Sequence, residues 1–260
     1  MDLELDGKAC IVTGATSGIG LATARLLCDE GARVLFVARD ADELERVSRE
    51  CGGEFLAADI TDPGAGESIA AACAQRLGSV DVLVNNAGTS FVRSLEELTD
   101  EDWQSQWELH VMGPMRLMRA AAPLMGQAGW GRIVNVASSA GKRPSLTNPA
   151  YAVTKAAQLS LSRLFADRFA SDGVLVNAVT PGAVSSPLWT APGGLAEQAA
   201  QARGISVEEA LDAQRAKIPL GRFAEPQEVA AVIVFLCSER ASTVTGSAWS
   251  ADGGTVPGIL

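Results

Sequence analysis

Short runs of apolar residues alternate along this chain with longer segments whose apolar positions recur at helical spacing. Apolar runs predict strands at residues 9–12, 34–38, 55–58, 82–84, 133–137 and 175–179, with a candidate last strand at 247–250. These runs are nearly continuous in apolar character, which is typical of strands whose two faces are both covered by helices. Helical patterns are found at about 19–30, from 41 onward and at 150–170.

This order of strands and helices predicts one α/β domain over residues 1–260, built on a doubly wound parallel sheet with right-handed crossovers. One irregular stretch, at about 187–219, interrupts the alternation and contains a helical pattern at about 207–216. A connection of that length is unusual and often serves as a lid over a ligand. The alternative interpretation is a surface excursion with helices of its own.

Composition and charge exclude several functions. The formal net charge is −10, so nucleic acid is a poor partner. The five cysteines are scattered without CxxC spacing, which argues against a zinc site, any other metal centre and a disulfide framework. The acidic start does not resemble a signal peptide, and no apolar run approaches the 18 residues or so that a membrane helix needs. We therefore expect a soluble cytoplasmic protein without membrane or nucleic-acid partners.

A glycine-rich turn follows the first predicted strand and opens the first predicted helix. Its residues read Thr13-Gly14-Ala15-Thr16-Ser17-Gly18-Ile19-Gly20, a GxxxGxG spacing. Glycines permit a tight turn and close approach of the backbone to a pyrophosphate, and the helix N-terminus offers unpaired N–H groups. Such turns are common by themselves, but a strand before and a helix after favour dinucleotide binding.

The end of the second strand bears on the choice between NAD and NADP. In dinucleotide folds an acidic residue here binds the ribose 2′-OH of NAD, whereas an arginine accommodates the 2′-phosphate of NADP. Arg39 and Asp40 stand side by side. Asp40 also fits a capping box with Glu43, as the N-cap of the next helix. That interpretation leaves Arg39 to contact a phosphate, so the sequence favours NADP(H) over NAD(H), with a solvated surface arginine as the alternative.

Chemically useful residues follow several other strands. Asp59-Ile60 follows the third strand and either contacts the adenine or only caps a turn, and Asn85-Asn86-Ala87-Gly88 follows the fourth. In an open parallel sheet ligands bind beyond the carboxyl ends of the strands. We therefore expect one edge of the sheet to gather six candidate positions: Gly14, Arg39, Asp59, Asn86, Ser138 and Pro181.

Ser138, Tyr151 and Lys155 carry the candidate chemistry. Tyr151 is the only tyrosine, and it lies four residues before Lys155 on a predicted helix, so the two side chains share one face. A nearby ammonium stabilises phenolate, and we expect it to lower the pKa of Tyr151 toward the range of proton transfer at neutral pH. The Ser138 hydroxyl is placed to hydrogen-bond a substrate oxygen.

Together these motifs resemble the short-chain dehydrogenase/reductase family along nearly the whole chain. Ile218–Phe223 (IPLGRF) and Asp252-Gly253-Gly254 are similar to the branch that includes 3-oxoacyl-carrier-protein reductases. The resemblance implies a Rossmann-type sheet of seven strands and a homotetramer or homodimer. It implies that Tyr151 is the general acid or base, that Lys155 holds the nicotinamide ribose and that Ser138 orients the substrate. It also implies further cofactor contacts from Gly14, Ser17, Gly18, Ile19, Gly20, Asp59, Ile60, Asn86, Ala87, Gly88, Pro181, Gly182, Val184 and Ser186.

The sequence departs from the family pattern at His110, the only histidine. It occupies the place of an asparagine that, in the family, helps to hold a water in a proton relay. Imidazole also forms hydrogen bonds and titrates near neutral pH. We therefore keep His110 as a candidate catalytic residue that preserves, alters or breaks the relay, with a histidine packed in a helix as the alternative.

Fewer residues of the sequence point to substrate binding than to cofactor binding. Phe91, Leu188 and Trp189 are candidate apolar wall residues, whereas Trp103 and Trp107 are expected to pack a helix against the core. Lys142-Arg143 either attracts an anionic substrate or is a solvated pair. The sequence predicts an NADP(H)-dependent oxidoreductase of small carbonyl and alcohol substrates. Two alternatives remain: an NAD-dependent alcohol dehydrogenase, and a nucleotide-sensing protein without catalysis.

Overall fold

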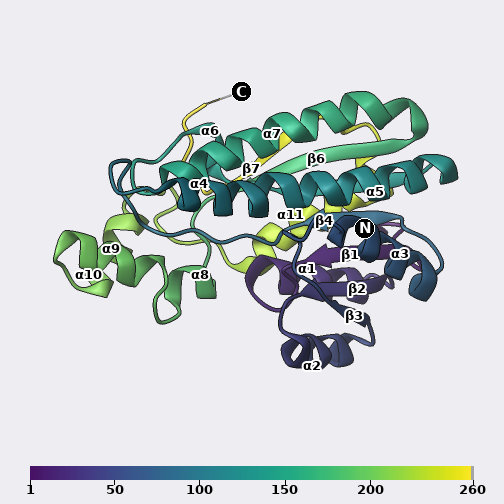
Figure 1. The fold of residues 1–260 in the computed structure, drawn as a ribbon, viewed down its shortest axis with the longest axis horizontal. Coiled ribbons are helices and arrows are strands. Elements are labelled where there is room, and N and C mark those ends of the chain that lie inside the picture. The colour runs from purple at the N-terminus through teal and green to yellow at the C-terminus, as the bar shows by residue number, and fades with distance from the viewer. Residues whose placement is uncertain (259–260) are drawn as a thin grey trace.

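The computed structural model describes residues 1–258, and in this range the chain builds one parallel sheet flanked by helices (Figure 1). The strands are β1 Ala9–Thr13, β2 Arg33–Ala38, β3 Glu54–Ala57, β4 Val82–Asn85, β5 Gly131–Val136, β6 Val174–Pro181 and β7 Ala248–Ala251. The longer helices are α1 Gly18–Asp29, α2 Ala41–Cys51, α3 Ala65–Leu77, α4 Asp100–Trp107, α5 Gly113–Ala128, α7 Pro149–Phe169, α9 Leu195–Arg203, α10 Val207–Arg215 and α11 Pro226–Cys237.

The strands are ordered β3-β2-β1-β4-β5-β6-β7, and every neighbouring pair is parallel. The predicted doubly wound sheet of seven strands is therefore confirmed, with strand ends within a few residues of the expected ones. The chain reverses its direction of winding between β1 and β4. At such a switch point the loops at the carboxyl ends of two neighbouring strands diverge, which leaves a crevice for a ligand.

Helices cover both faces of the sheet and create two apolar cores. Successive residues of β1 point to opposite faces, so that Cys10 and Val12 belong to one core and Ala9 and Ile11 to the other. The first core holds apolar side chains of α1, α2 and α11, and the second those of α3, α5 and α7. Both faces of the strands are buried, which explains the continuous apolar runs in the sequence.

The start of α2 corrects part of one prediction. Asp40 is the N-cap, and its Oδ1 accepts a hydrogen bond of 3.1 Å from the backbone N–H of Glu43. The reciprocal half of the expected capping box is wrong, because the Glu43 carboxylate pairs with the guanidinium of Arg46 one turn later. The carboxylate of Asp40 is nevertheless engaged in a hydrogen bond at the N-terminus of α2.

The helix after β4 continues through a π-helical turn, η1 Glu108–Met112, into α5. Trp107, at the end of α4, is 39% exposed, so the expectation that it packs against the core is wrong. Trp103 is half-buried. A π-helical turn encloses one more residue than an α-helical turn, and such turns are often found at functional sites. Here it contains the only histidine, His110.

The irregular stretch 187–219 folds into helices of its own. The short helix α8, Pro187–Thr190, leads to α9 and α10, which extend from one end of the molecule (green in Figure 1). The Gln198 side chain accepts a hydrogen bond of 2.7 Å from the backbone of Val92. Trp189 packs edge to face on Phe223, at 5.1 Å between ring centroids. The segment thus has its own small core and is tied to the loop after β4.

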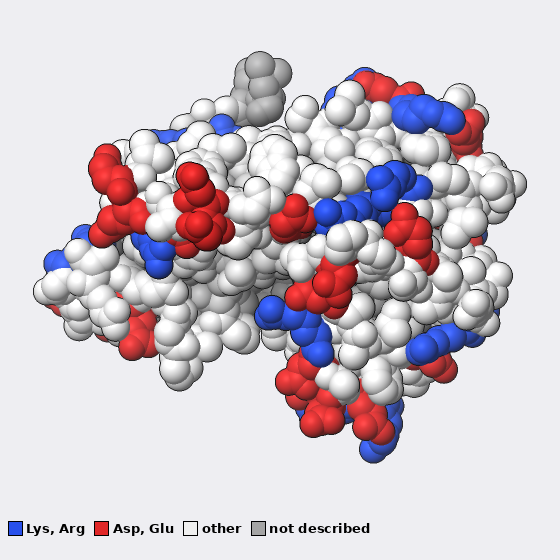
Figure 2. Space-filling model, in the orientation of Figure 1, with Lys and Arg blue, Asp and Glu red and all other residues white. Residues whose placement is uncertain are grey.

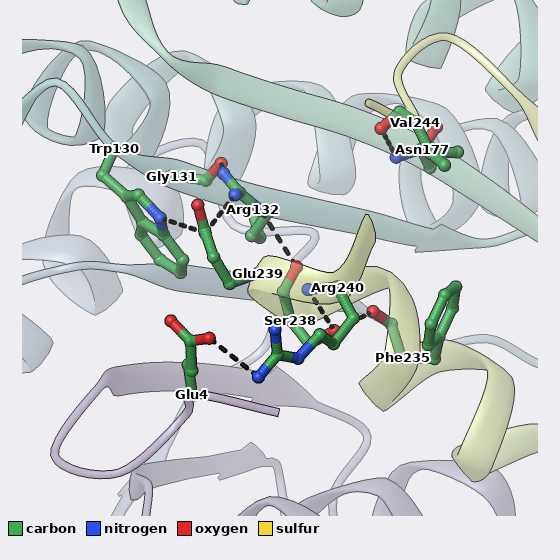
Figure 3. A network of polar contacts seen from close by, with 10 residues as sticks. All are labelled: Glu4, Trp130, Gly131, Arg132, Asn177, Phe235, Ser238, Glu239, Arg240 and Val244. Carbon is green, nitrogen blue, oxygen red and sulfur yellow. Dashed lines mark hydrogen bonds and ion pairs between the residues drawn. The ribbon is translucent and has the colours of Figure 1, made fainter. Parts of the chain in front are cut away.

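A polar network lies at the amino-terminal edge of the sheet, at the start of β5 (Figure 3). Arg132 is only 3% exposed, and its guanidinium donates to the Glu239 carboxylate at 2.7 Å. The same carboxylate accepts a hydrogen bond of 2.9 Å from the Trp130 indole. The indole ring lies between the cations of Lys8 and Arg132, at 3.7 and 4.4 Å. The network joins β5 to the turn η3, Glu239–Ala241.

We expect Glu239→Ala to destabilise the protein by about 1–3 kcal/mol, because the nearly buried guanidinium of Arg132 loses its charged partner. Urea denaturation measures this free energy. Asp167→Ala, which removes an exposed ion pair with Arg163 on α7, is the matched control and should cost less than about 1 kcal/mol. Equal losses in the two variants would show that the buried network adds nothing to stability.

No helix within residues 1–258 combines the length and apolar character needed to cross a bilayer. The same residues contain no cluster of histidine, cysteine and acidic side chains that would suit a metal ion.

Candidate active site

A cavity of about 1030 Å³ lies at the carboxyl ends of the strands. It opens between α8 and the turn that leads into α2, and Figure 2 shows the surface hollowed in this region. The cavity is lined by residues that follow six different strands, as the parallel topology requires. The six positions expected to converge all lie on its wall: Gly14, Arg39, Asp59, Asn86, Ser138 and Pro181.

The glycine-rich turn after β1 forms a central part of the cavity wall, between the loops that follow β2 and β4. Gly14 and Gly18 have φ values of 65° and 53°, a region that favours glycine. A Cβ on Gly14 would lie 2.9 Å from the Cα of Ala87, so the turn passes directly against the loop after β4. The Asn86 amide donates to the carbonyl oxygens of Thr13 and Gly14 at 2.9 and 3.3 Å. The Asn86 side chain thus ties the loop after β4 to the end of the neighbouring strand β1.

Gly20 has a different place from the other glycines of the motif. It does not line the cavity, and a Cβ there would lie 2.2 Å from the Gly14 carbonyl oxygen and 2.4 Å from the Asn86 amide nitrogen. Its lack of a side chain lets α1 begin directly beneath the turn. The Ser17 side chain makes no capping hydrogen bond, so it does not satisfy the first N–H groups of α1. The residues at this helix start, Ser17, Gly18 and Ile19, line the cavity.

Arg39, Asp59, Ile60 and Thr61 form the next part of the wall. Arg39 is exposed, and within the described part of the chain no carboxylate lies within ion-pair distance of it. The Asp59 carboxylate accepts hydrogen bonds of 2.9 and 2.8 Å from the backbone and hydroxyl of Thr61. These bonds, with a smaller contribution from the Arg39 charge, lower the pKa of Asp59.

Arg116 and Glu108 also line this part of the cavity, and the sequence did not single them out. The Arg116 guanidinium donates to the Thr61 carbonyl at 2.9 Å and to the Glu108 carboxylate at 3.0 Å. An ion pair between η1 and α5 thus fixes the loop after β3.

Ser138, Tyr151 and Lys155 line the same cavity on the β5 side of the turn. Ser138 is the N-cap of the short helix α6, Ser139–Lys142, and its Oγ accepts from the backbone of Ala140 at 3.1 Å. Tyr151 and Lys155 lie one turn apart on α7, and the ammonium is 5.6 Å from the centre of the phenol ring. The loop after β6 adds Pro181, Gly182, Val184 and Ser186 to the same wall.

The ionisation of this group differs from the sequence-based expectation. Burial raises the pKa of Tyr151 above its usual value, although the Ser138 side chain opposes the shift. The expected lowering is therefore wrong for this structure. Spacing along the helix does not report burial, and burial outweighs any help that the phenolate receives from its neighbours. Burial also lowers the pKa of Lys155, to about 7, so this amine is only about half ionised at neutral pH. At that pH the phenol keeps its proton.

His110 is fully buried and does not line the cavity. Its ring packs edge to face on the Tyr151 ring, at 5.3 Å between centroids. The Thr154 hydroxyl donates to the Tyr151 carbonyl at 2.9 Å, so it accepts from His110 Nδ1 at 3.1 Å. His110 Nε2 then accepts from the backbone N–H of Thr89 at 3.3 Å. The ring is thus a neutral imidazole, and burial and the Lys155 charge lower its pKa well below the usual value.

The three apolar residues expected on the substrate side, Phe91, Leu188 and Trp189, all line the cavity. Lys142 does not, because its ammonium donates to the Ala248 carbonyl at 2.8 Å and holds α6 against β7. Sequence reasoning missed Gln106 on α4, which lines the cavity, is 3% exposed and has an Oε1 without a hydrogen-bond partner in residues 1–258. A polar residue at a buried position of a helix was the available signal.

Known proteins match nearly the whole chain. The family model described as enoyl-(acyl carrier protein) reductase matches residues 14–256. The 3-oxoacyl-[acyl-carrier-protein] reductase of Thermotoga maritima is 34% identical, over 98% of this chain and 100% of that protein. D-threitol dehydrogenase of Mycolicibacterium smegmatis is also 34% identical, over 97% of this chain and 94% of that protein. The crystal structure of L-sorbose reductase from Gluconobacter frateurii with NADPH and L-sorbose has a TM-score of 0.92 at 36% identity, covering 100% of both chains.

The relatives match this chain over nearly its full length and are named as a reductase and a dehydrogenase, and the solved reductase shares its fold. Most residues of the cofactor and catalytic motifs line one cavity. The chain therefore belongs to the short-chain dehydrogenase/reductase family and is an oxidoreductase of alcohol and keto groups.

Proposed function

We propose that this protein is an NADP(H)-dependent oxidoreductase that interconverts a carbonyl and a secondary alcohol through Ser138, Tyr151 and Lys155. The observation that carries the proposal is that these side chains and the glycine-rich turn line one and the same cavity. A cavity of about 1030 Å³ has room for a dinucleotide with a small substrate. The solved structure of L-sorbose reductase, which holds NADPH and L-sorbose, supports NADP(H) as the cofactor and a small carbonyl compound as the substrate.

The residues present fit a dinucleotide. The N–H groups at the start of α1 have no side-chain cap and suit a diphosphate, and Gly14 lets the backbone approach it closely. Arg39 is free to contact a phosphate on the adenosine ribose, while Asp40 is engaged at the N-terminus of α2. The bound nicotinamide supplies or accepts the hydride. The residues of this chain supply binding, orientation and the proton.

Tyr151 gives its proton to the carbonyl oxygen in reduction and takes it back in oxidation. Its raised pKa keeps the phenol protonated at neutral pH, which suits donation in the reductive direction. Ser138 orients the substrate oxygen, and Lys155 holds the nicotinamide ribose. Positioning of the reactants in the cavity supplies a large part of the rate enhancement.

His110 acts in this scheme as a positioning residue. It does not line the cavity and its ring stays neutral at neutral pH, but it packs on the Tyr151 ring and joins Thr89 to Thr154. A Cβ on Gly88 would lie 3.1 Å from the imidazole, so glycine in the loop after β4 makes room for the larger ring. The segment 187–219, which brings Leu188 and Trp189 to the wall, acts as the substrate lid.

The test is a panel of ketones, ketoses and 3-oxoacyl thioesters, and of the corresponding alcohols, measured with NADPH or NADP and with NADH or NAD. We expect turnover of at least one carbonyl with NADPH. Turnover with NADH alone would favour an NAD-dependent dehydrogenase. Cofactor binding without turnover of any compound would favour a nucleotide sensor.

Arg39→Ala tests the preference for NADP(H). Loss of a charge-assisted contact of about 1.5–3 kcal/mol should weaken NADPH binding about 10- to 100-fold and leave NADH binding nearly unchanged. Fluorescence titration of both nucleotides measures this. Arg49→Ala, on the exposed side of α2, is the matched control for the lost charge. Unchanged NADPH affinity in Arg39→Ala would contradict the role of this residue.

A further inference from the structure

Lys155 is held by two acceptors that lie on different elements. Its ammonium donates to the carbonyl oxygen of Val136, at the end of β5, at 2.8 Å and to the side-chain Oε1 of Gln158, one turn later on α7, at 3.1 Å. An ammonium has three N–H donors. Two are fixed within the protein, and the third is left for a group in the cavity that Lys155 lines.

The surroundings of this ammonium contain no opposite charge. Lys155 is 3% exposed, and within residues 1–258 no carboxylate forms an ion pair with it. The titratable groups packed near it are Tyr151 on its own helix and the neutral His110 of η1. Desolvation alone lowers its pKa to about 7. The two neutral acceptors are therefore the groups that favour its charged form.

Gln158 is itself held in place. It is 1% exposed, and its backbone carbonyl accepts a hydrogen bond of 2.7 Å from the Ser162 hydroxyl. That hydroxyl accepts from the Asn135 amide of β5 at 2.8 Å, and the Asn135 side chain accepts from Asn85 of β4 at 2.8 Å. This buried polar chain runs from the middle of the sheet to α7, so Gln158 reaches Lys155 from a rigid base.

We infer that Gln158 is a positioning residue for Lys155. Its side-chain oxygen directs the third N–H of the ammonium into the cavity and helps to keep the amine protonated. The inference rests on the proposed function for its catalytic meaning, but the contact itself is a property of the protein alone. A backbone carbonyl such as that of Val136 is present in any variant. Only Gln158 contributes an acceptor that a side-chain substitution removes or charges.

Two substitutions change this acceptor in opposite directions. Gln158→Met keeps the length of the side chain and removes the amide oxygen, so the Lys155 pKa should fall by about half a unit to one unit. Gln158→Glu places a carboxylate beside the ammonium, so the Lys155 pKa should rise by about one to three units. Opposite shifts are not expected if Gln158 only fills space.

The chain has only four lysines, Lys8, Lys142, Lys155 and Lys217. Titration of protein labelled with ¹³C at lysine Cε therefore follows each one by NMR, and Lys155→Arg identifies the resonance. Gln127→Met and Gln127→Glu, on the exposed end of α5, control for the same changes elsewhere. A Lys155 midpoint that is the same in wild type and both Gln158 variants would overturn the inference.

The pH dependence of turnover gives the second measurement. If ammonium is the active form, kcat falls as pH rises through the Lys155 pKa, so the fall should come at lower pH in Gln158→Met and at higher pH in Gln158→Glu, with the KM of the carbonyl little changed. Parallel profiles for all three proteins would overturn the inference. The NMR titration needs no turnover, so it reports on the contact between Gln158 and Lys155 even if the proposed function is wrong.

Discussion

Tyr151→Phe should lower kcat by about 10²- to 10⁴-fold, because the variant loses the proton donor and keeps the ring. The phenol lies beside Ser138 and Lys155 on the cavity wall, and the ring packs on His110, a contact that phenylalanine preserves. NADPH affinity should change little, since we propose that most of the cofactor contacts come from the turn after β1 and from the loops after β2, β4 and β6. Steady-state kinetics and fluorescence titration measure the two quantities separately.

The single tyrosine provides an internal check on this prediction. Alkaline difference absorbance near the phenolate band reports Tyr151 alone, and its titration should lie above the reference value near 10. The same signal should be missing in Tyr151→Phe. Turnover by that variant close to the wild-type rate would remove the phenol from the mechanism, even if the spectroscopic titration behaved as expected.

Gly20→Ala is expected to have the second large effect. The new Cβ would lie 2.2 Å from the Gly14 carbonyl oxygen and 2.4 Å from the Asn86 amide, well inside van der Waals contact. Either α1 moves away from the turn or the turn changes shape, at a cost of about 1–3 kcal/mol in unfolding free energy. Because we propose that the turn and the start of α1 bind the diphosphate of the cofactor, NADPH affinity should fall at least about tenfold.

Gly64→Ala is the matched control for Gly20→Ala. Gly64 has a φ of −92°, and among the described residues no neighbouring atom lies within 4 Å of the position that an added methyl group would take, so alanine should fit without strain. Thermal melts and NADPH titrations of both variants make the comparison. If Gly20→Ala were as stable as Gly64→Ala and bound NADPH normally, the close packing of α1 on the turn would not matter for the cofactor.

Much of the fold could be predicted from the sequence because its signals are local. Apolar runs bounded by glycine or polar residues indicated the strands, and their buried faces in the structure explain why the runs do not alternate. Parallel topology then required the residues after the strands to meet at one edge. For this reason Gly14, Arg39, Asn86 and Ser138 could be assigned to one cavity from the order of the elements alone.

The properties that the sequence did not reveal depend on partners from distant elements. The tautomer of His110 follows from Thr89 and Thr154, which approach it from a loop and from α7. The reversed shift in the Tyr151 pKa follows from burial, which spacing along a helix does not report. Gln158 stands out only once the ammonium of Lys155 is seen to point at it.

The network around Arg132 lies at the start of β5, whereas Val136, at the end of the same strand, lines the cavity. β5 has six residues, which span roughly 20 Å between the two sites at about 3.3 Å per residue. We therefore expect substitutions at the Arg132 network to change thermal stability with little effect on the cavity. A variant that loses thermal stability through changes in the cavity should be able to regain it through changes at this network, without altered geometry around Ser138, Tyr151 and Lys155.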